Sequence, residues 1–128
     1  MTARTRYIVR DVDEAVRFYV DCLGFELQEQ FGPAMAIVTC KGLSLWLAGP
    51  AASASRAMPN GHKPEPGGWN RIVLETAELE SKVARLRAKG VTFRNEIVSG
   101  PGGLQILCDD PSGNPVELFE PPARSVSG

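Results

Sequence analysis

The amino-acid sequence predicts an α+β fold in which two βαβββ modules form a single domain. A helical apolar pattern that ends at a glycine occurs twice, and three short extended segments follow each copy. A stretch rich in small residues and proline separates the two copies. Because 128 residues are enough for one hydrophobic core but few for two independent ones, we expect both modules to share one domain.

Module one covers about residues 4–49 and reads strand, helix, glycine and strand over residues 7–25. Asp11 and Glu14 have the spacing of a capping box at the start of the helix, and Gly24 stands where a left-handed residue ends it. The apolar residues at helical spacing are Val12, Ala15, Val16, Tyr19, Val20 and Leu23. The extended segments are residues 25–31, 34–40 and 43–49.

Module two covers about residues 69–122 and repeats this order, starting with a strand at residue 72. Thr76 is the predicted helix cap, Glu78 and Glu80 lie in the first turn, and Gly90 ends the helix. The apolar stripe of this helix consists of Leu79, Val83 and Leu86. The extended segments are residues 91–98, 104–109 and 114–120.

Two further segments lie outside the modules. Residues 50–68 are rich in Gly, Pro, Ala and Ser and lack an apolar period, which is typical of a connecting loop. Residues 123–128 are expected to form a flexible tail. Each module by itself is too small to be stable, so the two are expected to pair their sheets into one structure.

The charge pattern excludes several classes of partner. The net charge is −1, and no basic run is interleaved with aromatic residues, so we expect neither a nucleic acid nor an anionic membrane as partner. The first 15 residues lack a long apolar stretch, and three widely spaced cysteines fit reduced thiols. These features favour a cytoplasmic protein with a small-molecule ligand.

Two sequence runs resemble a known family. The runs "DVDEAVRFYVDCLGFEL", at residues 11–27, and "DPSGNPVELFEP", at residues 110–121, are similar to the glyoxalase, bleomycin-resistance and extradiol dioxygenase superfamily, also called vicinal oxygen chelate (VOC) proteins. The resemblance covers about residues 4–122. It implies a curved mixed sheet from each module, a concave cavity formed by the two sheets, and a homodimer, which the sheet edges of the modules also favour.

The resemblance also identifies four positions at which metal-dependent members of the family hold their ion. In this chain those positions align with Arg4, Trp46, Arg71 and Glu117. An arginine stays protonated and has no lone pair to offer, so Glu117 alone could bind a metal. The single histidine, His62, lies in the linker, whereas an iron site of the dioxygenase type needs two imidazoles. We therefore expect a metal-free member without a cofactor.

These four residues lie on one face of the predicted strands if they occupy the family positions. They either line a cavity for a planar or anionic small molecule, or form an internal ion pair between an arginine and Glu117, and the two interpretations are compatible. Trp69 either lines the mouth of the cavity or anchors the linker. Asp109 and Asp110 are assigned to turn chemistry rather than to a paired carboxylate site.

Two functions fit this pattern. The favoured hypothesis is a metal-independent protein that sequesters an aromatic or heterocyclic compound, as bleomycin-resistance proteins do. The alternative is a glyoxalase I-like lyase, an isomerase or a dioxygenase that uses a divalent metal or Glu117, which is the one residue we nominate as a general base.

Overall fold

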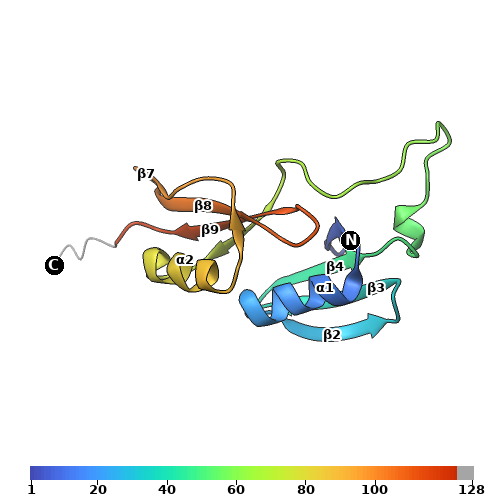
Figure 1. The fold of residues 1–128 in the computed structure, drawn as a ribbon, viewed down its shortest axis with the longest axis horizontal. Helices are drawn as coiled ribbons and strands as arrows, with labels where there is room; N and C mark the ends of the chain where they lie inside the picture. Colours follow the sequence, from blue (N-terminus) through green and yellow to red (C-terminus); the bar gives the residue numbers. More distant parts are fainter. Residues whose placement is uncertain (124–128) are drawn as a thin grey trace. The chain divides into compact units, whose positions relative to one another are not determined.

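The computed structural model describes residues 1–123 and divides the chain into two compact units. Unit 1 consists of Met1–Gly68 and Asp110–Asn114, and unit 2 consists of Trp69–Asp109 and the residues from Pro115 onward. Figure 1 shows that both units contain strands together with a helix. The predicted α+β class with two mixed sheets is therefore confirmed.

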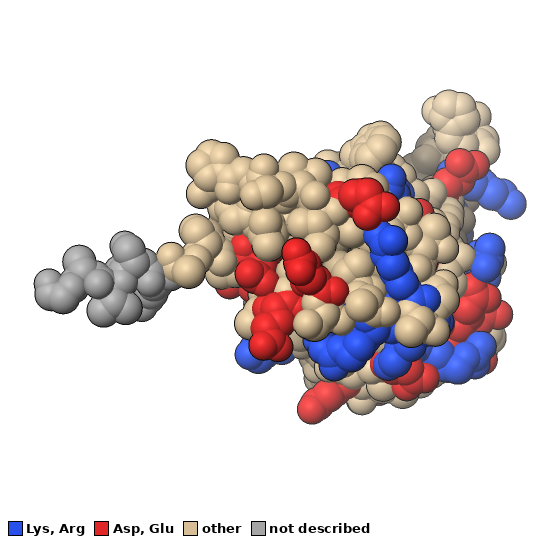
Figure 2. Space-filling view, turned by 60° about the vertical axis from the view of Figure 1, so that its left-hand side comes forward, with Lys and Arg blue, Asp and Glu red and all other residues tan. Residues whose placement is uncertain are grey.

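The predicted tail at residues 123–128 lies, apart from Ala123, outside the described residues. No helix among residues 1–123 is long and apolar enough to cross a membrane. On the face shown in Figure 2, acidic and basic side chains are interspersed, and no extended basic patch covers that face.

Unit 1 follows the predicted βαβββ order. Its elements are β1 (Thr5–Ile8), α1 (Val12–Arg17), a π-helical turn η1 (Phe18–Cys22), β2 (Glu26–Phe31), β3 (Met35–Cys40) and β4 (Leu43–Ala48). The strand order is β1-β4-β3-β2, with β1 parallel to β4 and the other neighbours antiparallel. The core of unit 1 lies between the sheet and the helical segment. It consists of alternate residues of β3 and β4 together with apolar residues of α1 and η1: Ala36, Val38, Leu45, Leu47, Val12, Ala15 and Tyr19.

The helix of unit 1 starts and stops where the sequence predicts. The Asp11 side chain accepts a hydrogen bond from the Glu14 backbone N–H at 2.8 Å, and Gly24 has a φ of 77°. The capping box is not closed, because the Glu14 carboxylate pairs with Arg10 at 2.8 Å instead. The cap therefore depends on Asp11 alone.

Unit 2 contains a five-stranded sheet and one helix. Its elements are β5 (Ile72–Glu75), α2 (Leu79–Ala88), β6 (Thr92–Phe93), β7 (Val98–Gly100), β8 (Gly103–Asp109) and β9 (Pro115–Glu120). The order is β5-β9-β8-β6, with β7 also paired to β8 and β5 parallel to β9. The predicted apolar stripe of α2 is confirmed, since Leu79, Val83 and Leu86 are all buried.

The extended segment predicted over residues 91–98 is divided into β6 and β7. The backbone N–H of Arg94 still donates to Leu107 O at 2.9 Å, as in a continuous ladder. The N–H of Leu107, however, donates to the Asn95 side chain at 3.0 Å. A side-chain acceptor thus replaces a backbone acceptor, and regular pairing ends there.

The predicted cap at Thr76 is wrong. Helix α2 begins at Leu79, after Glu78 in a left-handed conformation with a φ of 54°, and the Thr76 hydroxyl donates to Ala77 O. The Leu79 N–H donates instead to the Glu120 carboxylate at 2.7 Å. An anionic acceptor from the end of β9 therefore satisfies the positive end of the helix.

The turn at residues 110–114 belongs to unit 1, although β8 and β9 on either side of it belong to unit 2. As predicted, Asp110 makes turn hydrogen bonds, because its Oδ1 accepts from the N–H groups of Ser112 and Asn114, both at 2.9 Å. Its Oδ2 accepts from the Tyr19 hydroxyl at 2.9 Å and from Asn114 Nδ2 at 3.0 Å. Asp110 is 3% exposed, so the carboxylate is buried with four donors around it.

Asn114 extends this buried network. Its Nδ2 donates to Ile8 O at 2.8 Å, and its Oδ1 accepts from the Gly67 N–H at 2.8 Å. The Ser112 hydroxyl accepts from the Arg10 N–H at 2.9 Å. The turn is thereby bonded to the chain at the end of β1 and at the end of the predicted linker.

The assignment of Asp109 to the turn is wrong. Asp109 is the last residue of β8, and its carboxylate pairs with Arg94 Nε at 2.6 Å. The two adjacent aspartates therefore have different roles, because the alternation of the strand points their side chains in different directions.

We expect Asp110→Ala to lower the free energy of unfolding by about 3 kcal/mol, because it removes the acceptor of four hydrogen bonds, three of which are buried. Urea unfolding measures the change. The control Asp109→Ala removes a partly exposed ion pair and is expected to cost about 1 kcal/mol or less. Equal losses for the two variants would show that the buried network is not what stabilises the fold.

Candidate functional site

The strand register relates the candidate residues of the two units. The parallel strand pairs have the same register in both, with Thr5 opposite Leu45 in unit 1 and Ile72 opposite Val116 in unit 2. Arg4 and Arg71 therefore occupy equivalent positions, and so do Trp46 and Glu117. The register is the one that the internal repeat predicts, but the chemistry at these positions differs between the units.

In unit 2, an arginine and a glutamate meet on one face of the sheet. Arg71 donates from Nε and Nη2 to Glu117 Oε1, at 3.1 and 2.9 Å. A further bond joins Arg71 Nη1 to Trp69 O at 3.3 Å. The Glu117 side chain is 11% exposed, so its charge is largely removed from water and is compensated by the guanidinium. The predicted internal ion pair between an arginine and Glu117 is confirmed, and of Arg4 and Arg71 it is Arg71 that forms it.

The opposite face of this sheet is apolar, as the alternation predicts. Ile72, Val116 and Leu118 are buried, and Leu74 is partly buried. Glu117 lies between Val116 and Leu118 in sequence, so its side chain points to the other face.

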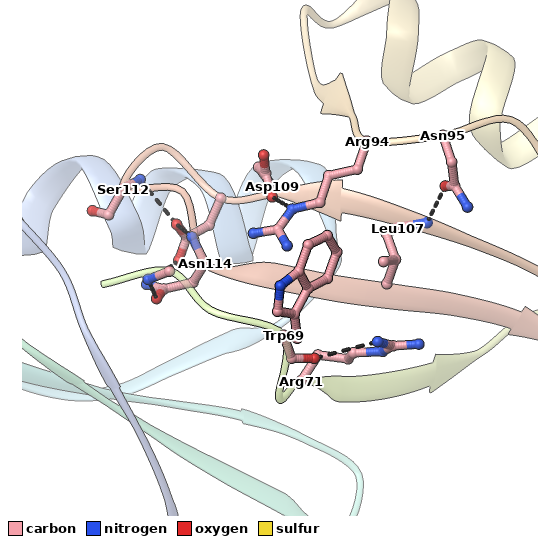
Figure 3. A network of polar contacts seen from close by, with 10 residues as sticks. Trp69, Arg71, Arg94, Asn95, Leu107, Asp109, Ser112 and Asn114 are labelled. Carbon is pink, nitrogen blue, oxygen red and sulfur yellow. Dashed lines mark hydrogen bonds and ion pairs between the residues drawn. The ribbon is translucent and has the colours of Figure 1, made fainter. Parts of the chain in front are cut away.

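A second ion pair, which the sequence did not predict, shares this face with Glu117. The Arg94 guanidinium pairs with Asp109 and lies over the Trp69 ring, 4.8 Å from its centroid. Figure 3 shows the guanidinium beside the indole, and the Trp69 residue is 69% exposed. A cation over an exposed indole forms an aromatic and charged surface rather than a buried anchor.

Strand parity could have identified this pair. Asp109 lies opposite Pro115, two residues before Glu117, and so lies on the same face as Glu117. Reading "DDPSGN" as turn chemistry alone hid this relation.

In unit 1, Trp46 lies opposite Arg6 on β1 and Ile37 on β3. The Arg6 guanidinium is 5.0 Å from the centroid of the Trp46 ring. Arg4 precedes β1, is exposed, and donates from Nη1 to Ala3 O at 3.0 Å. The sequence thus identified Arg4 as the arginine of this face, whereas the structure brings Arg6 over Trp46. Strand alternation could have identified Arg6 as well, because Arg4 and Arg6 are two residues apart and therefore point to the same face of the sheet.

Two donors on this face of unit 1 lack an acceptor. The Trp46 indole N–H is buried without a hydrogen-bond partner among residues 1–123. The Arg6 guanidinium forms no ion pair within the same described range. Arg6 is exposed, so water can hydrate its guanidinium, whereas the buried Trp46 N–H carries the cost of about 1–3 kcal/mol for an unsatisfied donor.

A pocket of about 320 Å³ in unit 1 is lined by Arg6 but not by Trp46. Its walls include Arg6, Phe31, Met35, Ala48 and residues 51–53. Residues 51–53 come from the segment predicted as a plain connecting loop. Apart from Arg6 and Ser53, the side chains named here are apolar, so the pocket combines an apolar interior with one cation.

The four family positions do not fit a metal ion. Their side chains offer a single carboxylate, and its Oε1 already accepts two hydrogen bonds from Arg71. Among residues 1–123, no group of three or more His, Cys, Asp or Glu side chains is placed to hold a metal. His62 is exposed in a turn, where its backbone N–H donates to Asn60 Oδ1 at 3.1 Å.

Comparisons with known proteins identify the fold. The model of the Glyoxalase/Bleomycin resistance protein/Dioxygenase superfamily matches residues 2–118. A similar structure is lactoylglutathione lyase from Agrobacterium tumefaciens, with 25% identity, a TM-score of 0.72, and coverage of 94% of this chain and 92% of that one. No curated protein matches the sequence significantly.

Two further solved structures are similar over nearly their whole length. TnmS3, an antibiotic-binding protein from a Streptomyces species, has 27% identity and a TM-score of 0.65, with 95% of this chain and 98% of that one covered. The fosfomycin resistance protein FosX from Listeria monocytogenes has 17% identity and a TM-score of 0.71, with 95% and 93% covered, which shows the shared fold alone.

The pair of Arg71 and Glu117 should show measurable coupling. In a double-mutant cycle of Arg71→Met and Glu117→Gln, we expect a coupling free energy of about 1 kcal/mol, because both side chains are partly shielded from water. The more exposed pair of Arg10 and Glu14 is the control, with an expected coupling of about 0.3–0.5 kcal/mol. Urea unfolding of the variants gives both values, and no coupling in the first cycle would contradict the ion pair.

Proposed function

Because the chain belongs to the glyoxalase/bleomycin resistance protein/dioxygenase superfamily, we propose that it is a metal-independent member that binds and sequesters a small aromatic or heterocyclic compound. The observation that carries the proposal is the ion pair of Arg71 and Glu117. Among the four family positions, only Glu117 carries a carboxylate. Its charge is compensated by Arg71, which occupies another of these positions. A divalent cation at Glu117 would have to displace the Arg71 guanidinium.

The similar structures support a binding function. TnmS3 is an antibiotic-binding protein, and this chain resembles it over nearly its full length at 27% identity. In unit 1 the groups that we assign to ligand binding are Arg4, Arg6 and Trp46, and in unit 2 they are Trp69, Arg71 and Glu117. Aromatic rings beside guanidinium groups suit a flat ligand that carries acceptors.

The similarity to lactoylglutathione lyase favours a second candidate, a glyoxalase-like lyase or isomerase. In that function Glu117 would act as a metal ligand or as a general base. The contact of Arg71 with Glu117 Oε1 makes this candidate the weaker one, since the carboxylate is already engaged.

The proposal includes a homodimer in the cytoplasm. Strand β2 is at the edge of the unit 1 sheet and carries two exposed apolar side chains, Leu27 and Phe31, with 45% and 49% exposure. An open edge with apolar residues favours pairing with a second copy. The free cysteines Cys22, Cys40 and Cys108 suit a reducing compartment.

We expect the purified protein to contain far less than one divalent ion per chain. The content should remain this low even after incubation with Mn²⁺, Ni²⁺ or Zn²⁺ followed by desalting. Elemental mass spectrometry measures the content, and Glu117→Gln is the matched variant, in which the content should stay the same. One ion per chain in the wild type that is lost in Glu117→Gln would overturn the proposed function and favour the lyase.

Native mass spectrometry tests the assembly. We expect a species of twice the 13.8 kDa chain mass, with any co-purified ligand as additional mass. Leu27→Glu places a charge on the β2 edge, at a side chain that does not line the unit 1 pocket, and should shift the population toward the monomer. A wild type that is monomeric at all concentrations would contradict the dimer.

A further inference from the structure

We infer that the pocket of unit 1 binds an aromatic carboxylate, a flat apolar ring that bears one carboxylate group. This inference rests on the proposed function and deepens it, because it assigns a ligand class to a defined pocket. The volume of about 320 Å³ is at the lower end of the range of about 300–1,000 Å³ that ligand sites occupy. A ligand of one or two fused rings matches that size.

The first step concerns charge. Arg6 lines the pocket and has no carboxylate partner among residues 1–123, whereas four other arginines do: Arg10, Arg71, Arg87 and Arg94. Its guanidinium is positioned 5.0 Å from the Trp46 ring centroid. A guanidinium over an aromatic face retains N–H groups at its edge, which can bind a carboxylate through two parallel hydrogen bonds.

The second step concerns donors and acceptors. The Arg6 guanidinium presents only donors to the pocket, whereas the buried Trp46 indole N–H is not part of its lining. A ligand that complements this face therefore has to supply acceptors. A carboxylate does so with one negative charge, which a single arginine balances, whereas a phosphate dianion would need more cations than the pocket provides.

The third step concerns the apolar body of the ligand. Phe31 and Met35 lie opposite each other at the end of the β2–β3 pair, and both line the pocket. An aromatic ring packs favourably against a phenyl group and a thioether. Ala48 adds only a methyl group next to Met35 on the same sheet, which leaves room for a flat ring.

The test uses two probes of the same shape, 1-naphthoate and uncharged 1-naphthamide. Both are titrated into the full-length wild-type protein, and calorimetry gives the dissociation constant of each. We expect naphthoate to bind about tenfold or more tightly than naphthamide, since a hydrogen bond to a charged group contributes more than a neutral one.

The variants assign the effect to Arg6. Arg6→Met should weaken naphthoate binding about tenfold to a hundredfold and change naphthamide binding less than about twofold. Arg17→Met is the matched control, because it removes the same charge from an exposed side chain of α1 that does not line the pocket, and it should leave both affinities unchanged. Arg6→Lys retains the charge without the planar fork and should give an intermediate affinity.

Phe31→Ala tests the apolar wall. It should weaken both probes to a similar extent, because both present the same ring to Phe31. Circular dichroism checks that each variant remains folded, and Phe31 and Arg6 are both exposed enough for the substitutions to be tolerated.

Equal binding of naphthoate and naphthamide, or equal losses in Arg6→Met and Arg17→Met, would overturn the inference. Its failure is distinguishable from failure of the proposed function. A metal-free protein that binds another compound but not naphthoate would refute the ligand class alone. Stoichiometric metal together with Arg6-dependent naphthoate binding would refute metal independence alone.

Discussion

The buried carboxylate of Asp110 is the interaction on which the rest of the structure depends most. A charge at this depth is tolerated only when hydrogen bonds replace its lost hydration, and here Ser112, Asn114 and Tyr19 supply all four. The Asp110 N–H also donates to Asn114 O, which closes the turn immediately before β9. The start of β9 is thus defined, and with it the strand register that points Glu117 away from the apolar face.

One substitution between the two modules explains their different chemistry. In unit 2 the family position on the last strand, β9, is Glu117, and this carboxylate compensates the charge of Arg71. In unit 1 the equivalent position is Trp46, which offers a ring and a donor but no negative charge. Arg6 consequently has an aromatic surface beneath it and forms no ion pair among the described residues. The same sheet geometry therefore holds an ion pair, Arg71 with Glu117, in unit 2 and an arginine without an ion-pair partner within the described part of the chain, Arg6, in unit 1.

Much of the fold could be predicted because it depends on local patterns. The helix of unit 1 begins at its Asp11 cap and ends before Gly24, and the stripe of α2 is buried, since capping, left-handed glycine and 3.6-residue periodicity all act within a few residues. The start of α2 could not be predicted, because its acceptor is Glu120, more than forty residues away. The interruption between β6 and β7 likewise depends on one Asn95 bond to another strand.

By itself, the sequence determined the α+β class, the internal repeat and the face on which Arg71 and Glu117 meet, because strand alternation and the repeat register leave one choice of face. Only the tertiary structure decided which arginine lies over Trp46, that Asp109 pairs with Arg94 rather than making the turn, and that residues 51–53 line a pocket. Parity assigns a side chain to a face. Its partner on that face depends on which strands and loops fold beside it, and no short stretch of sequence contains that information.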